Sequence, residues 1–165
     1  MKLVQTKRDN LLRPLQAVSG IVEKRHTLPI LSNVLFERSG DALLFLATDL
    51  EIQVSTSFDS PQKGSDNYSV TVSARKLIDI LRALPDNIDV SLKVDDKRAA
   101  LQAGRSRFSL QTMPVEDFPL VSTVQDWPAS FRMPQKQLRN LFQMVHFAMA
   151  VQDVRYYLNG LQSQS

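Results

Sequence analysis

A recurring order of elements is the feature that most constrains the fold of this chain. A short strand, a basic amphipathic helix and a set of alternating strands begin near Lys2 and begin again near Tyr68. A third round opens at Phe131 with a strand and a helix, and residues 154–158 begin one further strand. Repetition of one supersecondary unit is typical of folds that stack similar units around a shared core. The sequence therefore predicts an α+β protein built from repeated strand–helix–three-strand units.

The first round reads as one helix followed by three strands. Residues 8–18 repeat apolar side chains at helical spacing, which predicts an amphipathic helix. Its apolar face consists of Leu11, Leu12, Leu15 and Val18. Because proline is tolerated only near the first turn of a helix, Pro14 predicts that this helix is short or starts late. Strands are predicted over residues 34–38, 42–47 and 51–57.

The second round has the same order. Residues 68–73 alternate apolar and polar side chains, as a half-buried strand does. Ser73 is expected to cap the next helix, residues 75–84, which ends before Pro85. The apolar face of this helix is made of Leu77, Ile80, Leu81 and Leu84. The round is completed by three predicted strands, residues 88–94, 99–103 and 107–112.

A segment without periodicity separates the second round from the third. Residues 114–130 contain three prolines among acidic and hydroxyl side chains, which is typical of a linker. The predicted first domain is therefore residues 1–113, and residues 131–165 are the start of a second domain. Localisation in the cytoplasm is expected, because no apolar run is as long as a membrane span and the N-terminus is polar.

The third round is predicted to open with a strand at Phe131–Met133 and a helix over residues 134–148. Pro134 suits the first position of that helix, where its missing N–H costs nothing. The helix has an amphipathic face of Leu138, Leu141, Phe142 and Val145. Because the strands that would complete its sheet are missing from the sequence, we expect the helix to be poorly supported in isolation.

Positive charge is concentrated on the three predicted helices. They carry only two acidic residues, Asp9 and Asp79, whereas the remaining residues are slightly acidic in sum. Their seven basic residues are Arg8, Arg13, Arg75, Lys76, Arg82, Lys136 and Arg139. Surface helices often carry such residues only as a solvated face. A basic surface lined by helices also suits contact with phosphates that does not read the bases.

The motifs of the common enzyme classes are missing. The five glycines are scattered singly, so there is no phosphate-binding glycine loop, and no serine lies in a nucleophile elbow. Without cysteine the chain has no disulfide and no thiolate metal site. The adjacent acids Asp95-Asp96 and Glu116-Asp117 lie in predicted turns or linkers, where solvated acids are the common case. We expect a binding protein or scaffold with no cofactor and no metal.

Five ordered segments resemble one protein family, the β sliding clamps of bacterial DNA polymerase III. The likeness runs from the first residue to about Gly160 with few changes of spacing. The segments are Thr27–Asn33, Ala47–Ile52, Ser73–Lys76, Gly104–Leu110 and Gln152–Gly160. The resemblance implies three-domain subunits that form a head-to-tail dimeric ring. Helices would line the hole through which duplex DNA passes, and antiparallel sheets would form the outside.

The resemblance also assigns roles to individual residues. Arg25 and Gln152 would contact DNA, and we expect the helix cations Arg8, Arg13, Arg75, Arg82, Lys136 and Arg139 to face the same duplex. A partner subunit would contact an edge strand and a nearby helix through Lys76, Ile80, Leu84, Arg105, Arg107, Phe108 and Leu110. A pocket for short peptides of polymerase subunits and the clamp loader would begin with Arg155, Tyr157 and Leu158.

Two of these assignments leave alternatives open. Alternation places Phe108 and Leu110 on one face of their strand and Arg105, Arg107 and Ser109 on the other. The apolar pair and the arginine pair therefore cannot all serve one flat surface. The apolar pair is equally compatible with core packing, and the arginines with protection of a sheet edge by charge.

The sequence also departs from the family pattern, because it stops inside the second clamp domain. The rest of the peptide pocket and the third domain are therefore missing from it. Either the chain is a piece of a clamp that confers processivity on the polymerase by encircling DNA, or it acts alone. Acting alone, it would close no ring and would bind only clamp subunits, or DNA weakly.

Overall fold

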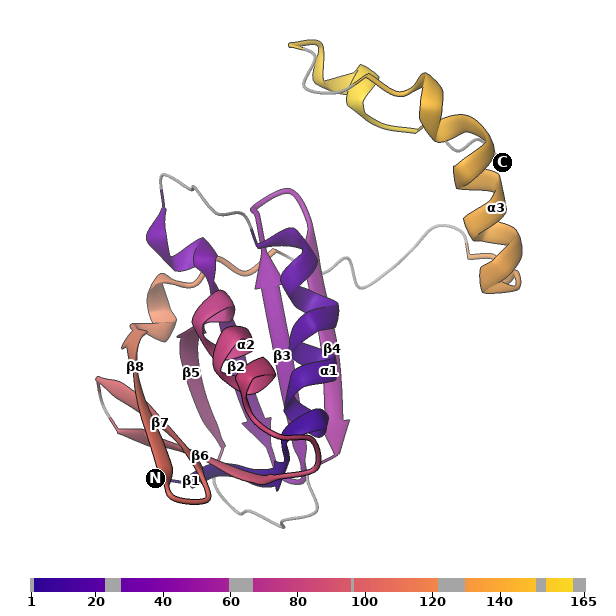
Figure 1. The fold of residues 1–165 in the computed structure, drawn as a ribbon. Helices are drawn as coiled ribbons and strands as arrows, with labels where there is room; N and C mark the ends of the chain where they lie inside the picture. Colours follow the sequence, from indigo (N-terminus) through magenta and orange to yellow (C-terminus); the bar gives the residue numbers. More distant parts are fainter. Residues whose placement is uncertain are drawn as a thin grey trace. The chain divides into compact units, whose positions relative to one another are not determined.

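The computed structural model describes residues 2–22, 28–59, 67–95, 97–121, 130–150 and 154–161. The chain divides into two compact units, Met1–Ser122 and Thr123–Ser165, which we call the first and the second unit. Every strand of the described residues lies in the first unit (Figure 1).

The first unit contains the strand–helix–three-strand order twice, as the sequence predicts. The first round is β1 (Lys2–Lys7), α1 (Arg8–Val18), β2 (Asn33–Ser39), β3 (Ala42–Thr48) and β4 (Gln53–Asp59). The second round is β5 (Tyr68–Ser73), α2 (Ala74–Ala83), β6 (Asp89–Asp95), β7 (Arg98–Ala103) and β8 (Ser106–Met113). Three short 3₁₀-helices accompany them: η1 (Ser19–Ile21), η2 (Pro29–Ser32) and η3 (Val115–Asp117).

The two rounds exchange their first strands. The strand order is β1-β6-β7-β8-β5-β2-β3-β4, and every pairing is antiparallel. Strand β1 of the first round therefore pairs with β6 of the second, and β5 of the second round pairs with β2 of the first. The exchange makes the two rounds one folding unit, because each half of this eight-stranded sheet contains a strand from the other round.

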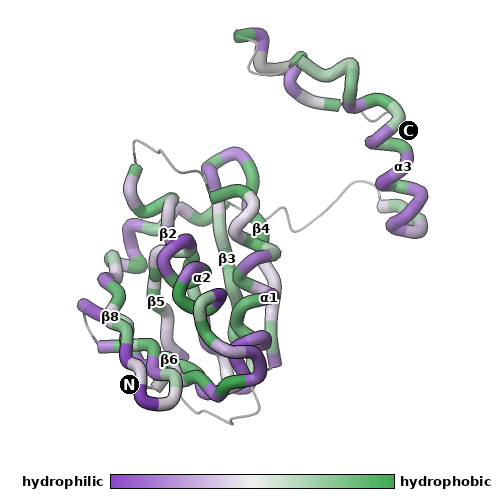
Figure 2. The backbone as a smooth tube through the Cα atoms, viewed as in Figure 1, coloured by the Kyte–Doolittle hydropathy of each residue, from purple (hydrophilic) through white to green (hydrophobic). Residues whose placement is uncertain are grey.

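Both helices lie against the same core. They contact each other, and α1 packs on β3 and β4 while α2 packs on β2 and β5 (Figure 1). Hydrophobic and hydrophilic residues alternate along both helices (Figure 2). The apolar face of each is buried, with Leu15, Leu77 and Leu81 fully enclosed among side chains from both halves of the sheet. The expected fold class, antiparallel sheets with basic helices on one face, is confirmed.

Two local expectations for the helices are wrong. Helix α1 runs the full length from Arg8 to Val18 with Pro14 inside it. The burial of four apolar side chains offsets the backbone hydrogen bond that the proline ring removes. Ser73 does precede α2, but its side chain makes no capping hydrogen bond.

A smaller cluster covers the opposite face of strands β2 and β3. Ile30 and Leu31 of η2 pack there with Leu35, Leu46 and Phe118, and all five are buried. The backbone N–H of Val121 donates to Oε1 of Gln53 at 2.9 Å. The segment that carries Phe118 and Val121 thus packs on the first unit, although the sequence places it in the linker, residues 114–130. The predicted domain bounds stay a prediction.

The second unit contains one α-helix, α3 (Gln135–Val145), and two 3₁₀-helices, η4 (His146–Ala148) and η5 (Tyr156–Asn159), in its described residues. The strands predicted at Phe131–Met133 and at residues 154–158 are wrong. A strand needs a neighbour for its backbone groups, and the described part of this unit offers none. Pro134 precedes the helix as its N-cap residue and is not its first residue.

Candidate nucleic-acid interface

The exposed side of α1 and α2 carries the cations that the sequence assigns to DNA contact. Burial of the apolar faces fixes the rotation of each helix, so that Arg13 on α1 and Arg75 and Arg82 on α2 are exposed. The two helices are in contact, and the exposed Gln16 of α1 meets Arg82 of α2. Arg13 lies three residues before Gln16 and Arg75 seven before Arg82, so these guanidinium groups lie on adjoining sides of the two helices. We call Arg13, Arg75 and Arg82, with Gln16 between the helices, the α1–α2 basic face.

Gln16 links the two helices across this face. With its amide oxygen turned toward α2, it accepts from Nε of Arg82 at 3.2 Å and from Nη2 at 2.9 Å. Sequence reasoning missed this residue, although Gln16 follows Arg13 by three positions and therefore shares its side of the helix. The other arginine of α2 has a looser contact, since Nε of Arg75 lies 3.9 Å from Oδ2 of Asp79 and both side chains are exposed.

A hollow of about 460 Å³ opens beside α2 and is lined by residues from its first turn to its last. Three cations line it, Arg75, Lys76 and Arg82, and hydroxyl groups come from Ser19 and Ser32 of the short helices η1 and η2. Lys76, which the sequence assigns to a subunit contact, therefore shares this hollow with two predicted DNA contacts. Asp79 lines the hollow as well, and the two hydroxyls already donate to the carbonyl oxygens of Gln16 and Pro29. Binding of phosphate oxygens in this hollow would therefore rest on its cations.

Arg8 is separate from this face. Its side chain is only 11% exposed, and its two terminal nitrogens form ion pairs of 2.6 Å with Asp9 and Asp86. The same guanidinium donates to the carbonyl oxygen of Leu84 at 3.2 Å. A group so enclosed and paired is unsuited to contact a duplex, so we leave Arg8 out of the interface.

The remaining predicted DNA contacts lie elsewhere in the chain. Lys136 and Arg139 are exposed on α3 of the second unit. Arg25 and Gln152 lie outside the described residues.

The predicted subunit contact divides into two parts. Ile80, Leu84 and Phe108 are half-buried and pack at the margin of the core, so each keeps some exposed apolar surface. Leu110 is only 5% exposed and belongs to the core itself, which fits the core-packing alternative. Arg107 is exposed on the same strand, and Arg105 is exposed in the turn before it.

Strand β8 has a partly free edge. It pairs with β7 over Ser106–Gln111, whereas on the other side only Thr112 and Met113 pair with β5 in the part of the chain that the structure describes. The stretch Ser106–Gln111 therefore offers backbone groups on one side, which is the feature that strand addition requires. Phe108 lies within this stretch.

The residues predicted to begin a peptide pocket lie in the second unit. Arg155 and Leu158 are exposed, Leu158 at 36%, and Tyr157 lies in η5. The backbone N–H of Leu158 donates to the carbonyl oxygen of Arg155 at 2.9 Å.

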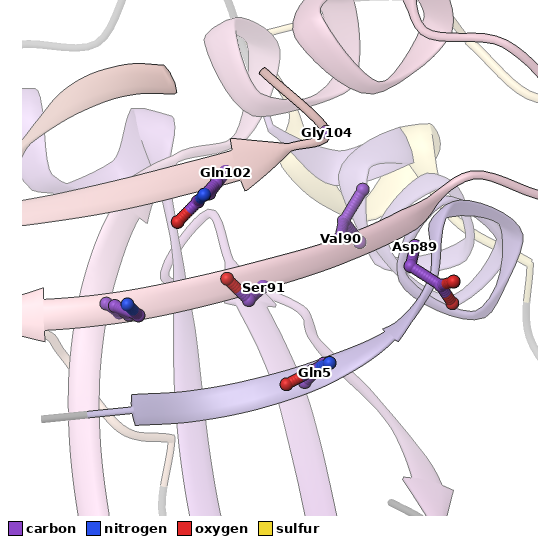
Figure 3. Close-up of a pocket in the computed structure, with 7 residues that line it drawn as sticks. Gln5, Asp89, Val90, Ser91, Gln102 and Gly104 are labelled. Atoms are coloured by element: carbon purple, nitrogen blue, oxygen red, sulfur yellow. The ribbon is translucent and has the colours of Figure 1, made fainter. Parts of the chain in front are cut away.

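A second hollow lies on the strands β1, β6 and β7 and has a polar lining. Its volume is about 360 Å³, and Gln5, Ser91 and Gln102 from the three strands face it (Figure 3). Asp89 also lines it but is paired with Lys7 at 2.9 Å. Among the described residues, no three acidic or histidine side chains gather as metal ligands do.

None of the described helices is long and apolar enough to cross a membrane.

Comparison with known proteins gives consistent matches. A family model described as the N-terminal domain of the DNA polymerase III beta subunit matches residues 1–122. The β sliding clamp of Pseudomonas putida is 46% identical over 158 residues, which cover 93% of this chain and 41% of that protein. The β sliding clamp of Escherichia coli K12 is 41% identical over 156 residues. The chain thus spans about two fifths of the length of these relatives.

Solved structures agree in fold. The DNA polymerase III beta subunit of Pseudomonas aeruginosa superposes with a TM-score of 0.86 at 44% identity, covering 97% of this chain and 43% of that one. The corresponding protein of Caulobacter crescentus gives a TM-score of 0.87 at 40% identity and covers 97% and 42%. From the family model and these relatives, the chain belongs to the DNA polymerase III beta subunit family, the β sliding clamps.

Proposed function

We propose that this chain contributes a DNA-facing wall and a subunit-contact surface to a sliding clamp. In this proposal the clamp encircles duplex DNA and keeps the replicative polymerase on its template, and it has no catalytic role. The single observation that carries the proposal is the α1–α2 basic face: Arg13, Arg75 and Arg82 project from two adjacent helices whose other sides are buried.

The chemistry of this face favours sliding over reading. Arginine side chains on a helical wall bind phosphates, which are the same at every base pair. A recognition helix in the major groove needs several side chains aimed at base edges, and the exposed arginines here come from the sides of two packed helices. The expected contact is therefore insensitive to sequence and sensitive to salt.

The half-buried residues Ile80, Leu84 and Phe108, with the free part of the β8 edge, form the proposed contact for a second subunit. An edge strand supplies backbone hydrogen bonds and the apolar residues supply burial, as in strand addition. Arg105 and Arg107 would add charge at the rim of this contact. Polymerase subunits and the clamp loader are proposed to bind through short peptides at a pocket that begins with Arg155 and Leu158.

DNA retention tests the proposed mode of binding. The 165-residue chain corresponds to about two fifths of its relatives, so we expect it to bind duplex DNA weakly at physiological salt. It should be retained equally on nicked circular and linear DNA, since only a closed ring distinguishes the two. A sub-micromolar dissociation constant at physiological salt would instead indicate a basic domain that binds nucleic acid directly.

Association with a full-length clamp tests the subunit contact. We expect Phe108→Asp to weaken binding of the chain to the P. putida clamp at least about tenfold, because a carboxylate would be buried among apolar groups. The fold should persist, since Phe108 is only half-buried. Ser109→Asp is the matched control: it adds the same charge one position away, on the exposed face of β8. Equal association of the two variants in sedimentation would contradict the assignment.

A further inference from the structure

Arg8 spans the whole connection between α2 and β6. Its Nη2 donates to the carbonyl oxygen of Leu84 at 3.2 Å and to Oδ1 of Asp86 at 2.6 Å. Its backbone N–H donates to the carbonyl oxygen of Ile88 at 2.9 Å. One residue at the start of α1 thus contacts the beginning, the middle and the end of residues 84–88, which we call the α2–β6 loop.

This loop needs an external anchor. Leu84 is the C-cap residue of α2, and the carbonyl groups of the last helical turn have no partner within the helix. Asn87 has a φ of 58°, in the left-handed region that asparagine adopts more readily than most residues, and it marks the tight turn of the loop. A guanidinium at a helix C-terminus also interacts favourably with the helix dipole. Arg8 supplies both the charge and the hydrogen bonds.

The Arg8 anchor carries a desolvation cost that its ion pairs offset. The Arg8 side chain is 11% exposed, and its Nε has no hydrogen-bond partner among the described residues. Burial of a charged group is unfavourable unless it is paired, and here Asp9 and Asp86 pair with it. Asp86 itself is 82% exposed, so the loop side of this anchor can be removed without opening a cavity.

The anchored loop carries part of the proposed subunit contact. Leu84 is both a hydrogen-bond partner of Arg8 and one of the half-buried residues of that contact, and Ile80 lies one turn earlier on α2. Apolar side chains contribute more to association when they are already ordered, because binding then costs less conformational entropy.

We propose that Arg8 is a positioning residue for the subunit contact: it holds the α2–β6 loop and thereby keeps Leu84 and the end of α2 ordered. The inference rests on the proposed subunit contact at Ile80, Leu84 and Phe108. It assigns to Arg8 a role in association between subunits in place of DNA contact.

Two variants weaken the anchor, one in the α2–β6 loop and one in α1. Asp86→Ala removes the exposed carboxylate, and Arg8→Lys keeps the charge but replaces the branched guanidinium with a single ammonium group. We expect each to weaken association with the full-length P. putida clamp about threefold to tenfold. Hydrogen exchange of the amides of residues 81–88 should rise about tenfold, while that of β2 and β3 stays unchanged. Asp86→Glu keeps the carboxylate, so its association with the clamp and its hydrogen exchange should both match those of the parent chain.

Asp89→Ala is the matched control. It also removes one exposed carboxylate close to the loop, but its partner is Lys7 at 2.9 Å and not Arg8. The control should associate like the parent chain. Normal association of both Asp86→Ala and Arg8→Lys would overturn the inference while leaving the Phe108→Asp result, and with it the proposed contact, intact.

DNA affinity separates the two roles of Arg8. If Arg8 instead binds DNA, Asp86→Ala frees its guanidinium group. DNA affinity then rises, and association with the clamp does not change. This result would overturn the inference. If Phe108→Asp also associates normally, the subunit contact itself is wrong and the inference fails with it. The expected result is unchanged DNA affinity together with weakened association.

Discussion

Helices α1 and α3 show how differently one sequence pattern behaves in the two units. Each has eleven residues and one apolar face. In the first unit α1 buries Leu11, Leu12, Leu15 and Val18. In the second unit α3 has no buried residue, and Leu141 and Val145 are about half exposed, at 53% and 48%. An amphipathic pattern thus predicts a helix in both places, but only a neighbouring sheet makes the helix part of a core.

The comparison assigns different physical roles to the two apolar faces. A fully buried leucine contributes about 2–3 kcal/mol relative to an exposed one. The face of α1 therefore stabilises the first unit, whereas the same kind of face on α3 gains little from the residues described around it. Exposed apolar surface of this kind is typical of a contact surface.

A pair of truncations should separate the units most strongly. Leu77→Ala removes a fully buried side chain and should lower the free energy of unfolding by about 3 kcal/mol. Leu141→Ala removes a half-exposed side chain of α3 and should change it by less than about 0.5 kcal/mol. Urea denaturation followed by far-UV circular dichroism measures the free energy of unfolding of both variants. Similar losses would mean that α3 has a buried position equivalent to that of α2.

Proline substitution tests how far packing supports each helix. Pro14→Ala restores the backbone donor to the carbonyl group of Asn10 and should stabilise the chain by about 1–2 kcal/mol. In α3, Asn140→Pro should abolish the helical signal of the second unit, because no side chain of that helix is buried among the described residues. Thermal melting and peptide-resolved hydrogen exchange report the two effects. A destabilising Pro14→Ala would show that the ring itself is needed for packing.

Removal of the second unit should have the smallest effect. A chain of residues 1–122 keeps both rounds and the complete eight-stranded sheet. We expect its melting temperature to lie within about 2 °C of that of the 165-residue chain, which corresponds to a few tenths of a kcal/mol. Calorimetry of the two chains measures this difference. A fall of ten degrees or more would contradict the independence of the first unit.

Local patterns predicted the elements well, and they failed where distant parts of the chain decide the outcome. Alternation found the strand β5, and helical spacing found α1 in spite of Pro14. The exchange of β1 and β5 between the rounds was beyond prediction, because pairing partners depend on contacts between residues far apart in sequence. The two wrong strands of the second unit have the same cause, since a strand pattern needs a neighbour to pair with.

In the candidate interface, too, local patterns predicted which residues share a face, and distant contacts decided which of them are exposed. Arg8 and Arg13 are five residues apart on one helix, and composition gives both a place on a basic face. Only the return of the chain at Asp86 encloses Arg8 and leaves Arg13 exposed. Leu110 and Phe108 likewise share a face of β8, but Leu110 lies deep in the core and Phe108 at its margin. Depth along a face cannot be read from alternation alone.

Charge reversal on the α1–α2 basic face tests the central claim most directly. The triple variant Arg13→Glu, Arg75→Glu, Arg82→Glu is compared with Lys93→Glu, Lys97→Glu, Arg98→Glu, which reverses three exposed cations on the β6–β7 hairpin. Binding to two duplexes of unrelated sequence is measured by fluorescence anisotropy at low ionic strength, where phosphate contacts are strongest.

We predict that the first variant loses most of its affinity for both duplexes and that the hairpin variant keeps the larger part. Equal losses in the two variants, or a loss for one duplex only, would contradict a phosphate-binding wall on α1 and α2.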